Sequence, residues 1–235
     1  MERTLTPEAT AKLDRRAALP VDGGRSIAIK RDVHEFVVDA DAAAFARAFR
    51  EVVTAADSTF GLIRVKRPGE RMGADFTIGE RFQGCFSLER ALRAAVTRRL
   101  PSVTPLLNEL LASPAVTRAI TWVEDQMLSD YAEIVALEEP APDRPGWRLC
   151  YRYLDGTPIA GSSVFTIEEL GPGRCRVRQI FEYQEVNAVA LLTFQRFGLK
   201  YHDQVVAMEI QRAADRCGAR VVSSTIPGAY AGLPS

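Results

Sequence analysis

The clearest pattern in this chain lies in its last third, where strand-like segments give way to one long helical segment. Residues 147–153 alternate large apolar or aromatic side chains with arginine and cysteine, which is the two-residue period of a half-buried strand. Residues 159–170 and 174–184 are also strand-like, and glycine-containing turns separate the three segments. The pattern therefore predicts an antiparallel sheet.

A proline-free segment at residues 187–217 follows this sheet and has the pattern of an amphipathic helix. At 1.5 Å per residue such a helix would be about 45 Å long, which is enough to lie across a whole sheet. Gly218 predicts its C-terminal end. The apolar stripe recurs at spacings of three and four and comprises Leu191, Phe194, Gly198, Tyr201, Val205 and Met208.

Shorter elements precede this part of the chain. Residues 39–41 predict the cap of a helix that begins near Ala42. Residues 6–8 have the Thr-Pro pattern of another helix start, which predicts a short helix up to about residue 18. Strands are predicted at residues 26–38, 60–66, 76–86 and 131–138.

Residues 88–119 interrupt the strand pattern with helical segments. Residues 88–100 predict an arginine-rich helix, residues 103–112 a short apolar helix, and Ser113-Pro114 the start of another. Residues 122–127 fit either a strand or a helix. We consider three roles for the insertion: a mobile lid over a cavity, a basic leucine-bearing helix that touches membrane lipid, or an extra helical layer or oligomer contact.

This order of elements resembles the START-like, or SRPBCC, superfamily, which includes the bacterial polyketide-cyclase/dehydrase and lipid-transport proteins and the birch-pollen-allergen-like proteins. The resemblance is carried by residues 33–49, 151–183 and 191–218, which match the first strand and helix, the closing strands and the long C-terminal helix. It is a match of pattern without an invariant catalytic signature.

The resemblance implies an α+β helix-grip fold, in which a curved antiparallel β-sheet wraps around a long C-terminal α-helix and leaves a hydrophobic tunnel between them. It covers roughly residues 26–87 and 120–218, so the helical segment at 88–119 is an insertion relative to the family. Family members bind sterols, phospholipids, flavonoids, polyketides or quinones, and some are enzymes, so the fold does not select a ligand. The expected organisation is an N-terminal extension at 1–25, one helix-grip domain at 26–220 and a C-terminal tail at 221–235.

The candidate ligand-binding residues lie on one face of the closing strands and on the stripe of the helix. A pocket lined by aromatic side chains with a few hydroxyls and one amide suits a mostly apolar ligand that carries one or two oxygens. The alternative is a filled core whose tyrosines reach the backbone or solvent. The candidates are Tyr151, Tyr153, Gln179, Phe181, Tyr183, Phe194, Tyr201, Val205 and Met208, of which Tyr151, Tyr153, Gln179 and Tyr183 would orient polar ligand atoms.

The two histidines, His34 and His202, are weaker candidates. A histidine can act as a general base near neutral pH, but adjacent helix residues point about 100° apart, so His202 and Asp203 form no ready dyad. We expect ordinary core or surface histidines. With two histidines and no Cys-x-x-Cys pair, we also expect no metal site.

Glutamates on the predicted strands are expected to pair with arginines across the solvated face of the sheet. A glutamate that turned inward instead would be a candidate acid or base with a raised pKa. The sequence does not distinguish them, and no catalytic residue can be named. The glutamates are Glu80, Glu133, Glu168 and Glu182, and the arginines are Arg148, Arg152, Arg176 and Arg178.

Composition narrows the class of protein. The 235 residues are 47% hydrophobic and 26% charged, which suits one domain with a large core. Thirty basic and 30 acidic residues balance, which argues against a general nucleic-acid binder. Four well-separated cysteines, a polar N-terminus and the lack of a bilayer-length apolar stretch predict a cytoplasmic protein without stable membrane insertion. No phosphate-binding or zinc-protease motif occurs, so we expect no cofactor.

Three hypotheses follow. The first is a protein that binds a small hydrophobic ligand, such as a lipid, polyketide or aromatic metabolite, between the sheet and the C-terminal helix. The second is a cofactor-independent polyketide cyclase, aromatase or dehydratase that uses the same cavity. The third is a protein-interaction module with a filled core. The oligomeric state stays open, a homodimer being one option. A solvent-reaching cavity favours the first two, and an inward glutamate or histidine beside a tyrosine favours the enzyme.

Overall fold

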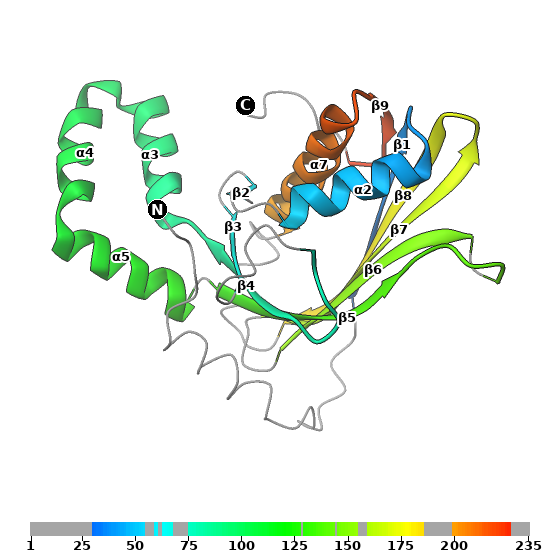
Figure 1. The fold of residues 1–235 in the computed structure, drawn as a ribbon. Helices are drawn as coiled ribbons and strands as arrows, with labels where there is room; N and C mark the ends of the chain where they lie inside the picture. Colours follow the sequence, from blue (N-terminus) through cyan, green and yellow to red (C-terminus); the bar gives the residue numbers. More distant parts are fainter. Residues whose placement is uncertain are drawn as a thin grey trace.

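The computed structural model of the chain describes residues 30–54, 59–60, 63–67, 75–127, 129–143, 145–154, 159–185 and 199–226 (Figure 1). Several predictions lie outside these residues: the short N-terminal helix, the first part of the C-terminal helix with Phe194, and the end of the tail. The side chain of Tyr201 is also outside the description.

The described residues form one sheet of nine strands, and each pair of neighbours is antiparallel. The first described strand of the chain pairs with the last long one, so segments far apart in sequence close the sheet at one side. From one edge to the other, the order is β2 (Thr59–Phe60), β3 (Ile63–Lys66), β4 (Arg81–Phe86), β5 (Ser129–Glu138), β6 (Gly146–Tyr153), β7 (Ile159–Gly171), β8 (Arg174–Glu185), β1 (Lys30–Val38) and β9 (Val221–Ser224).

Two helices, α2 (Ala42–Thr54) and α7 (Leu199–Arg216), lie side by side on one face of the curved sheet (Figure 1). Strand, helix, antiparallel strands and closing C-terminal helix follow one another as the START-like resemblance implied. The predicted α+β helix-grip fold is therefore confirmed, with α2 starting at the predicted residue.

A single large apolar cluster joins these two helices to the sheet. Phe45 and Phe49 stand four residues apart on α2 and are almost completely buried. Val206 and Ile210 repeat this spacing on α7 and are also buried. Burial of each such side chain contributes about 1.5–3 kcal/mol before the entropic cost of ordering it. The facing residues of β8 alternate, as predicted, with Cys175, Val177, Gln179, Phe181 and Tyr183 all buried.

The opposite face of the sheet carries the expected cross-strand ion pairs. Each is at least partly exposed, so each contributes little to stability by itself. The alternation of charged and apolar residues nevertheless determines which face of the sheet is buried. The pairs include Arg176 with Glu168 (2.7 Å), Arg178 with Glu35 (3.3 Å), Arg152 with Glu133 (3.3 Å), Arg148 with Glu138 (3.4 Å) and Arg31 with Glu182 (3.5 Å).

Glu80 is the exception among the four glutamates expected on this solvated face. Its side chain is buried, and its Oε1 accepts a 2.5 Å hydrogen bond from Nε of Arg67, which is also buried. The backbone N–H of Thr77 donates to the other carboxylate oxygen at 3.1 Å. Arg67 in turn lies over the ring of Phe76, with 4.6 Å between the guanidinium carbon and the ring centroid. The pair is therefore part of the interior.

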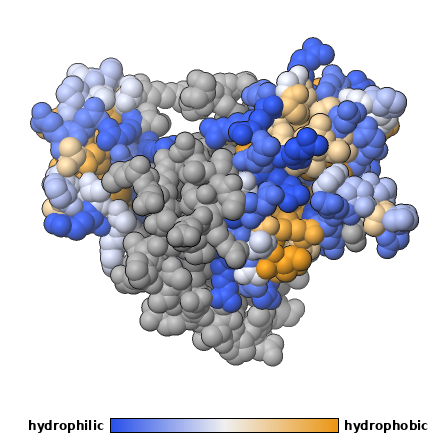
Figure 2. All heavy atoms as spheres, viewed as in Figure 1, coloured by the Kyte–Doolittle hydropathy of each residue, from blue (hydrophilic) through white to orange (hydrophobic). Residues whose placement is uncertain are grey.

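The insertion between β4 and β5 consists of α3 (Leu88–Arg99), the 3₁₀ helix η2 (Pro101–Val103), α4 (Thr104–Ala112) and α5 (Pro114–Met127). It stands apart from α2 and α7 at the other end of the sheet (Figure 1). Apolar side chains lie scattered among polar ones on its surface (Figure 2). Among the described helices, none is long and apolar enough to span a membrane. The exposed large apolar residues of the insertion are Leu92, Leu100, Val103, Leu106, Leu110 and Trp122.

The structure changes three predicted boundaries. The insertion is helical as far as Met127, so it is longer than the predicted 88–119. The strand predicted at 76–86 begins only at Arg81, because Gly79 adopts a turn with φ of 82° and Ile78 is 67% exposed. Residues 221–224, predicted as the start of a tail, form β9 and pair with β1. The sheet therefore extends beyond the predicted domain boundary at residue 220.

Candidate functional site

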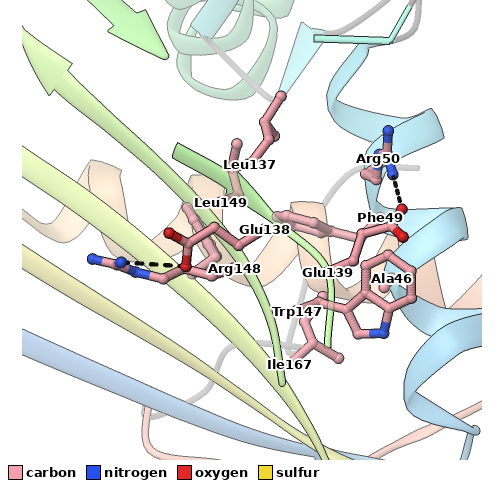
Figure 3. A pocket seen from close by; sticks show the side chains of 11 residues that line it. Ala46, Phe49, Arg50, Leu137, Glu138, Glu139, Trp147, Arg148, Leu149 and Ile167 are labelled. Atoms are coloured by element: carbon pink, nitrogen blue, oxygen red, sulfur yellow. Dashed lines mark hydrogen bonds and ion pairs between the residues drawn. The ribbon is translucent and has the colours of Figure 1, made fainter. Parts of the chain in front are cut away.

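A pocket opens between α2 and strands β5 to β7, on the face of the sheet that carries the helices (Figure 3). Its volume is about 110 Å³. This is smaller than the roughly 300–1,000 Å³ of sites that enclose a drug-sized molecule, so it suits a small molecule or one end of a longer one. The wall is mainly apolar and is formed by Ala46, Phe49, Leu137, Trp147, Leu149, Phe165 and Ile167.

Charged side chains lie at the mouth of this pocket. Arg50 of α2 reaches toward Glu139, which directly follows β5, with 3.8 Å between nitrogen and oxygen (Figure 3). Glu138 and Arg148 also border the pocket, but their side chains pair on the opposite face of the sheet. An apolar wall with a charged rim suits a ligand with an apolar body and a polar end.

Of the predicted ligand-binding residues whose side chains the structure describes, none lines the pocket, but the pocket adjoins them. Tyr151 lies on β6 two residues beyond Leu149, and its ring centroid is 6.5 Å from that of Phe165. Tyr151 also contacts Tyr153 edge-to-face at 5.8 Å. The predicted aromatic face and the pocket are therefore neighbouring parts of one sheet face.

The rings next along this face are stacked closely. Phe181 is fully buried between Tyr183, at 4.6 Å between centroids, and His202 of α7, at 4.2 Å. The interplanar angles of 15° and 21° correspond to near-parallel stacking. Helix and sheet side chains thus meet directly at this point. Of the two remaining described candidates on α7, Met208 is buried and Val205 packs against the main core.

Gln179 links the sheet to the helix through polar contacts. Its amide nitrogen lies 2.9 Å from Oγ of Ser163 and 3.0 Å from Nε2 of His202. Gln179 and Ser163 are both fully buried. Ser163 is also the register partner of Tyr151 on β6 and of Phe181 on β8. A row of polar groups therefore crosses the sheet beneath the N-terminal half of α7.

Glu209 of α7 acts electrostatically on Tyr151 and Tyr153. Burial raises the pKa of Glu209 to about 8, although Arg212 lowers it in part. Burial also raises the pKa of Tyr151 and of Tyr153, and the negative charge of Glu209 raises both further. At neutral pH, Glu209 is therefore mostly protonated and can donate a proton as well as accept one.

Both histidines of the chain lie together at the edge of this row. Their ring centroids are 6.0 Å apart, and Asp203 approaches both. Nε2 of His34 is 3.1 Å from Oδ1 of Asp203, and Nδ1 of His202 is 3.8 Å from the same oxygen. Burial opposes ionisation of Asp203, but its contacts with His202 and His34 hold its pKa well below the usual value. Burial lowers the pKa of His202.

The sequence pattern contained part of the signal for the residues that we did not predict. Alternation places Trp147 and Leu149 on the same face as Tyr151, and the four-residue spacing of Phe45 and Phe49 predicts a buried stripe. Neither pattern says that α2 crosses β6 and β7, which is needed to form the pocket. Glu209 has no distinguishing sequence signal, because glutamate is common on exposed helix faces.

Comparison with known proteins gives matches only among solved structures. No family model and no curated protein matches the chain. Truncated norcoclaurine synthase from Thalictrum flavum matches with 10% identity and a TM-score of 0.49 over 80% of this chain and 95% of that chain. The same enzyme in complex with dopamine and hydroxybenzaldehyde matches with 11% identity and a TM-score of 0.46 over 82% and 93%. A hypothetical protein from Helicobacter pylori matches with 12% identity and a TM-score of 0.45 over 89% and 95%. Matches at this level do not extend to function.

Proposed function

We propose that this protein binds a small, mostly apolar molecule in the pocket between α2 and strands β5 to β7. The observation that carries the proposal is the pocket itself, with an apolar wall and a charged rim. Trp147 and Phe49 offer flat aromatic surfaces from opposite sides of the space. The space of about 110 Å³ suits a small aromatic molecule, or one end of a lipid or polyketide whose remainder stays outside the pocket.

Burial of apolar ligand surface would supply most of the affinity. Each Å² removed from water contributes about 25 cal/mol before the cost of association. The ion pair at the mouth, Arg50 with Glu139, offers polar partners to a ligand that keeps one end in solvent.

Native mass spectrometry of the purified protein, combined with thermal shifts against fatty acids and flat aromatic compounds, tests this proposal. We expect one bound molecule per chain and a saturable rise in Tm. Leu137→Trp fills the pocket, because Leu137 lines it from β5, and should abolish both signals. Val135→Trp adds the same ring at a 38% exposed position of the same strand and should leave both signals intact. Equal behaviour of the two variants, or no binding by the parent protein, would contradict the proposal.

A second function, proton transfer on a bound substrate, is favoured by Glu209. A carboxyl group with a pKa of about 8 can act as a general acid or base near neutral pH, and the charge of Glu209 also acts on Tyr151 and Tyr153. This corresponds to a cyclase or dehydratase, in which positioning of a flexible chain supplies much of the rate enhancement.

Comparison of the parent protein with Glu209→Gln separates binding from catalysis. If Glu209 is catalytic, the variant should retain an unreacted substrate, and a dehydration or cyclodehydration product carried by the parent protein should be lighter by one water molecule. If both proteins carry the same molecule, or if neither changes a supplied polyketide-like thioester, the catalytic hypothesis fails while ligand binding stands.

A further inference from the structure

The two histidines of this chain come from distant segments, β1 and α7, yet their side chains meet at one point. His34 is 6% exposed, and it shares this point with His202 and Asp203. One potential ligand atom from each residue lies within 4.8 Å of the other two. The atoms are Nε2 of His34, which lies 3.1 Å from Oδ1 of Asp203, and Nδ1 of His202, which lies 3.8 Å from it.

These three atoms are buried but have no partner with hydrogen-bond geometry among the described residues. The shortest distance would allow a hydrogen bond, but the relative orientation of the two groups does not. Buried polar atoms that lack partners are costly, so their convergence calls for an explanation. A cation bound between them would satisfy all three at once.

We propose that His34, His202 and Asp203 bind a divalent transition-metal ion, such as Zn²⁺. Two imidazoles and one carboxylate are ligands that zinc and related metals accept. Metal–nitrogen and metal–oxygen bonds of about 2.0–2.2 Å place tetrahedral ligand atoms about 3.3 Å apart, and the 3.1 Å and 3.8 Å separations lie around that value. Small side-chain rotations bring the three atoms to one ion.

A fourth ligand is available beside these three. Oδ2 of Asp32 is 3.4 Å from Nε2 of His34, and the two residues lie on the same face of β1. The other carboxylate oxygen of Asp32 accepts a hydrogen bond from the backbone N–H of Val33, which orients the side chain. Asp203 and Asp32 are 29% and 36% exposed, so an ion or an exogenous ligand can enter from solvent.

Gln179 holds His202 in a suitable orientation for this role. Its amide group contacts Nε2 of His202 at 3.0 Å and Oγ of Ser163 at 2.9 Å, which leaves Nδ1 of His202 on the side of His34 and Asp203. If the amide is turned over, its oxygen accepts from both the imidazole N–H and the serine hydroxyl. Nδ1 then keeps its lone pair for a metal, as outer hydrogen bonds to ligating histidines commonly ensure.

Titration of the untagged protein with Co²⁺ and Zn²⁺ tests this site, with visible absorption and calorimetry as readouts. We expect one ion per chain, the d–d absorption of Co²⁺ with nitrogen and oxygen ligands, and a rise in Tm with metal. His34→Gln and Asp203→Asn should each weaken binding at least about tenfold. Glu35→Gln alters the next residue of β1, which pairs with Arg178 on the opposite face, and should bind like the parent protein.

Each alternative result overturns the site. Absence of stoichiometric binding by the folded parent protein excludes it without recourse to a variant. A thiolate-to-cobalt charge-transfer band would place the ion on cysteine instead. Metal binding that persists in both His34→Gln and Asp203→Asn, with circular dichroism showing that the variants are folded, would place it at other residues.

Discussion

The protonation state of the Glu209 side chain affects the stability of the whole fold. Burial raises its pKa to about 8 in the folded state, against an ordinary value near 4.5. Between these two values the folded protein holds a proton that the unfolded chain has lost. Stability therefore falls as pH rises through this range, by at most about 1.4 kcal/mol per pH unit.

Glu209→Gln replaces the ionisable carboxyl group by an amide that does not titrate. The free energy of unfolding of this variant should therefore depend less on pH between about pH 5 and pH 8. We expect the difference in free energy of unfolding between variant and parent to shift in favour of the variant from pH 5 to pH 8, as measured by urea denaturation. Glu168→Gln, which alters a partly exposed glutamate on the opposite face, provides the control. A difference for Glu209→Gln that stays constant over this range would show that the carboxyl group ionises normally.

The buried pair of Arg67 and Glu80 should respond quite differently. Glu80→Gln removes the carboxylate charge that pairs with the buried Arg67 guanidinium, which should cost about 3–5 kcal/mol. The double replacement Arg67→Met with Glu80→Leu removes both charges and should recover most of that loss. Denaturant titrations measure both. Equal losses for Glu80→Gln and for the exposed control Glu168→Gln would show that the pair is not buried.

At the scale of residues, the sequence indicated which kinds of side chain could bind or transfer protons better than it indicated where they lie in the fold. It named four strand glutamates as candidates for an inward carboxyl group, and the one that turns inward is Glu80. The glutamate whose pKa burial raises, Glu209, lies on α7 and was not among them. The sequence indicated no direct pairing of His202 with Asp203, but Nδ1 of His202 lies 3.8 Å from Oδ1 of Asp203. It could not see that β1 would bring His34 to Asp203, since this depends on where α7 crosses the sheet.

At the scale of elements, close approach of β7 and β8 requires glycine at position 161. Its φ is 140°, and a Cβ atom there would lie 1.9 Å from the carbonyl oxygen of Glu182. Gly161→Ala should therefore destabilise the protein by more than about 2 kcal/mol. Gly84→Ala in β4 meets nothing within 4 Å and should change stability by less than about 1 kcal/mol. Similar midpoints for the two variants in urea would contradict this account.

The inserted helices should be separable from the rest of the fold. Cys85 and Ser129 are register partners at the base of the insertion, so β4 and β5 would form a hairpin without it. The main apolar cluster contains no described residue of 88–127. Any stability lost on removal of the insertion should come from its base, where the hydroxyl of Ser129 donates a hydrogen bond to the backbone oxygen of Glu124 at 2.8 Å.

Replacement of residues 88–127 by an Asn-Gly turn should remove helical signal from the far-ultraviolet circular dichroism spectrum. The near-ultraviolet spectrum and a single cooperative thermal transition should remain. A variant that melts without cooperativity would show that the insertion is part of the core. Unchanged ligand binding in this variant would also argue against the insertion as a lid over the pocket.

The sequence predicted helices and strands well where the hydrophobic pattern was regular. It predicted them poorly where a single residue interrupts that pattern or where an element is very short. β6, β7 and β8 were identified closely because both faces of each strand have clear partners. β9 was missed because Val221 to Ser224 is short and lies at the edge of the sheet, where only its pairing with β1 defines it. The start of β4 was placed too early because Phe76 and Ile78 continue an apolar alternation that Gly79 interrupts.

At the scale of the whole molecule, one architecture brings three different sites onto one sheet face. The pocket lies under α2, Glu209 is carried by α7, and the histidine cluster joins α7 to β1, next to the edge strand β9. The helix-grip fold was predictable from the order of elements. The position of the pocket was not, because it depends on the crossing of α2 over β6 and β7 rather than on any stripe of residues.

The fluorescence of Trp147 tests the central claim most directly, because this residue lines the pocket and the only other tryptophan, Trp122, is 63% exposed on the insertion. In a Trp122→Phe background, titration with the apolar dye 8-anilinonaphthalene-1-sulfonate should quench Trp147 saturably, at one dye per chain. Leu137→Glu should abolish this response, whereas Val135→Glu on the exposed side of the same strand should preserve it. Quenching that does not saturate, or that is the same in both variants, would contradict the proposal that this pocket binds a small apolar molecule.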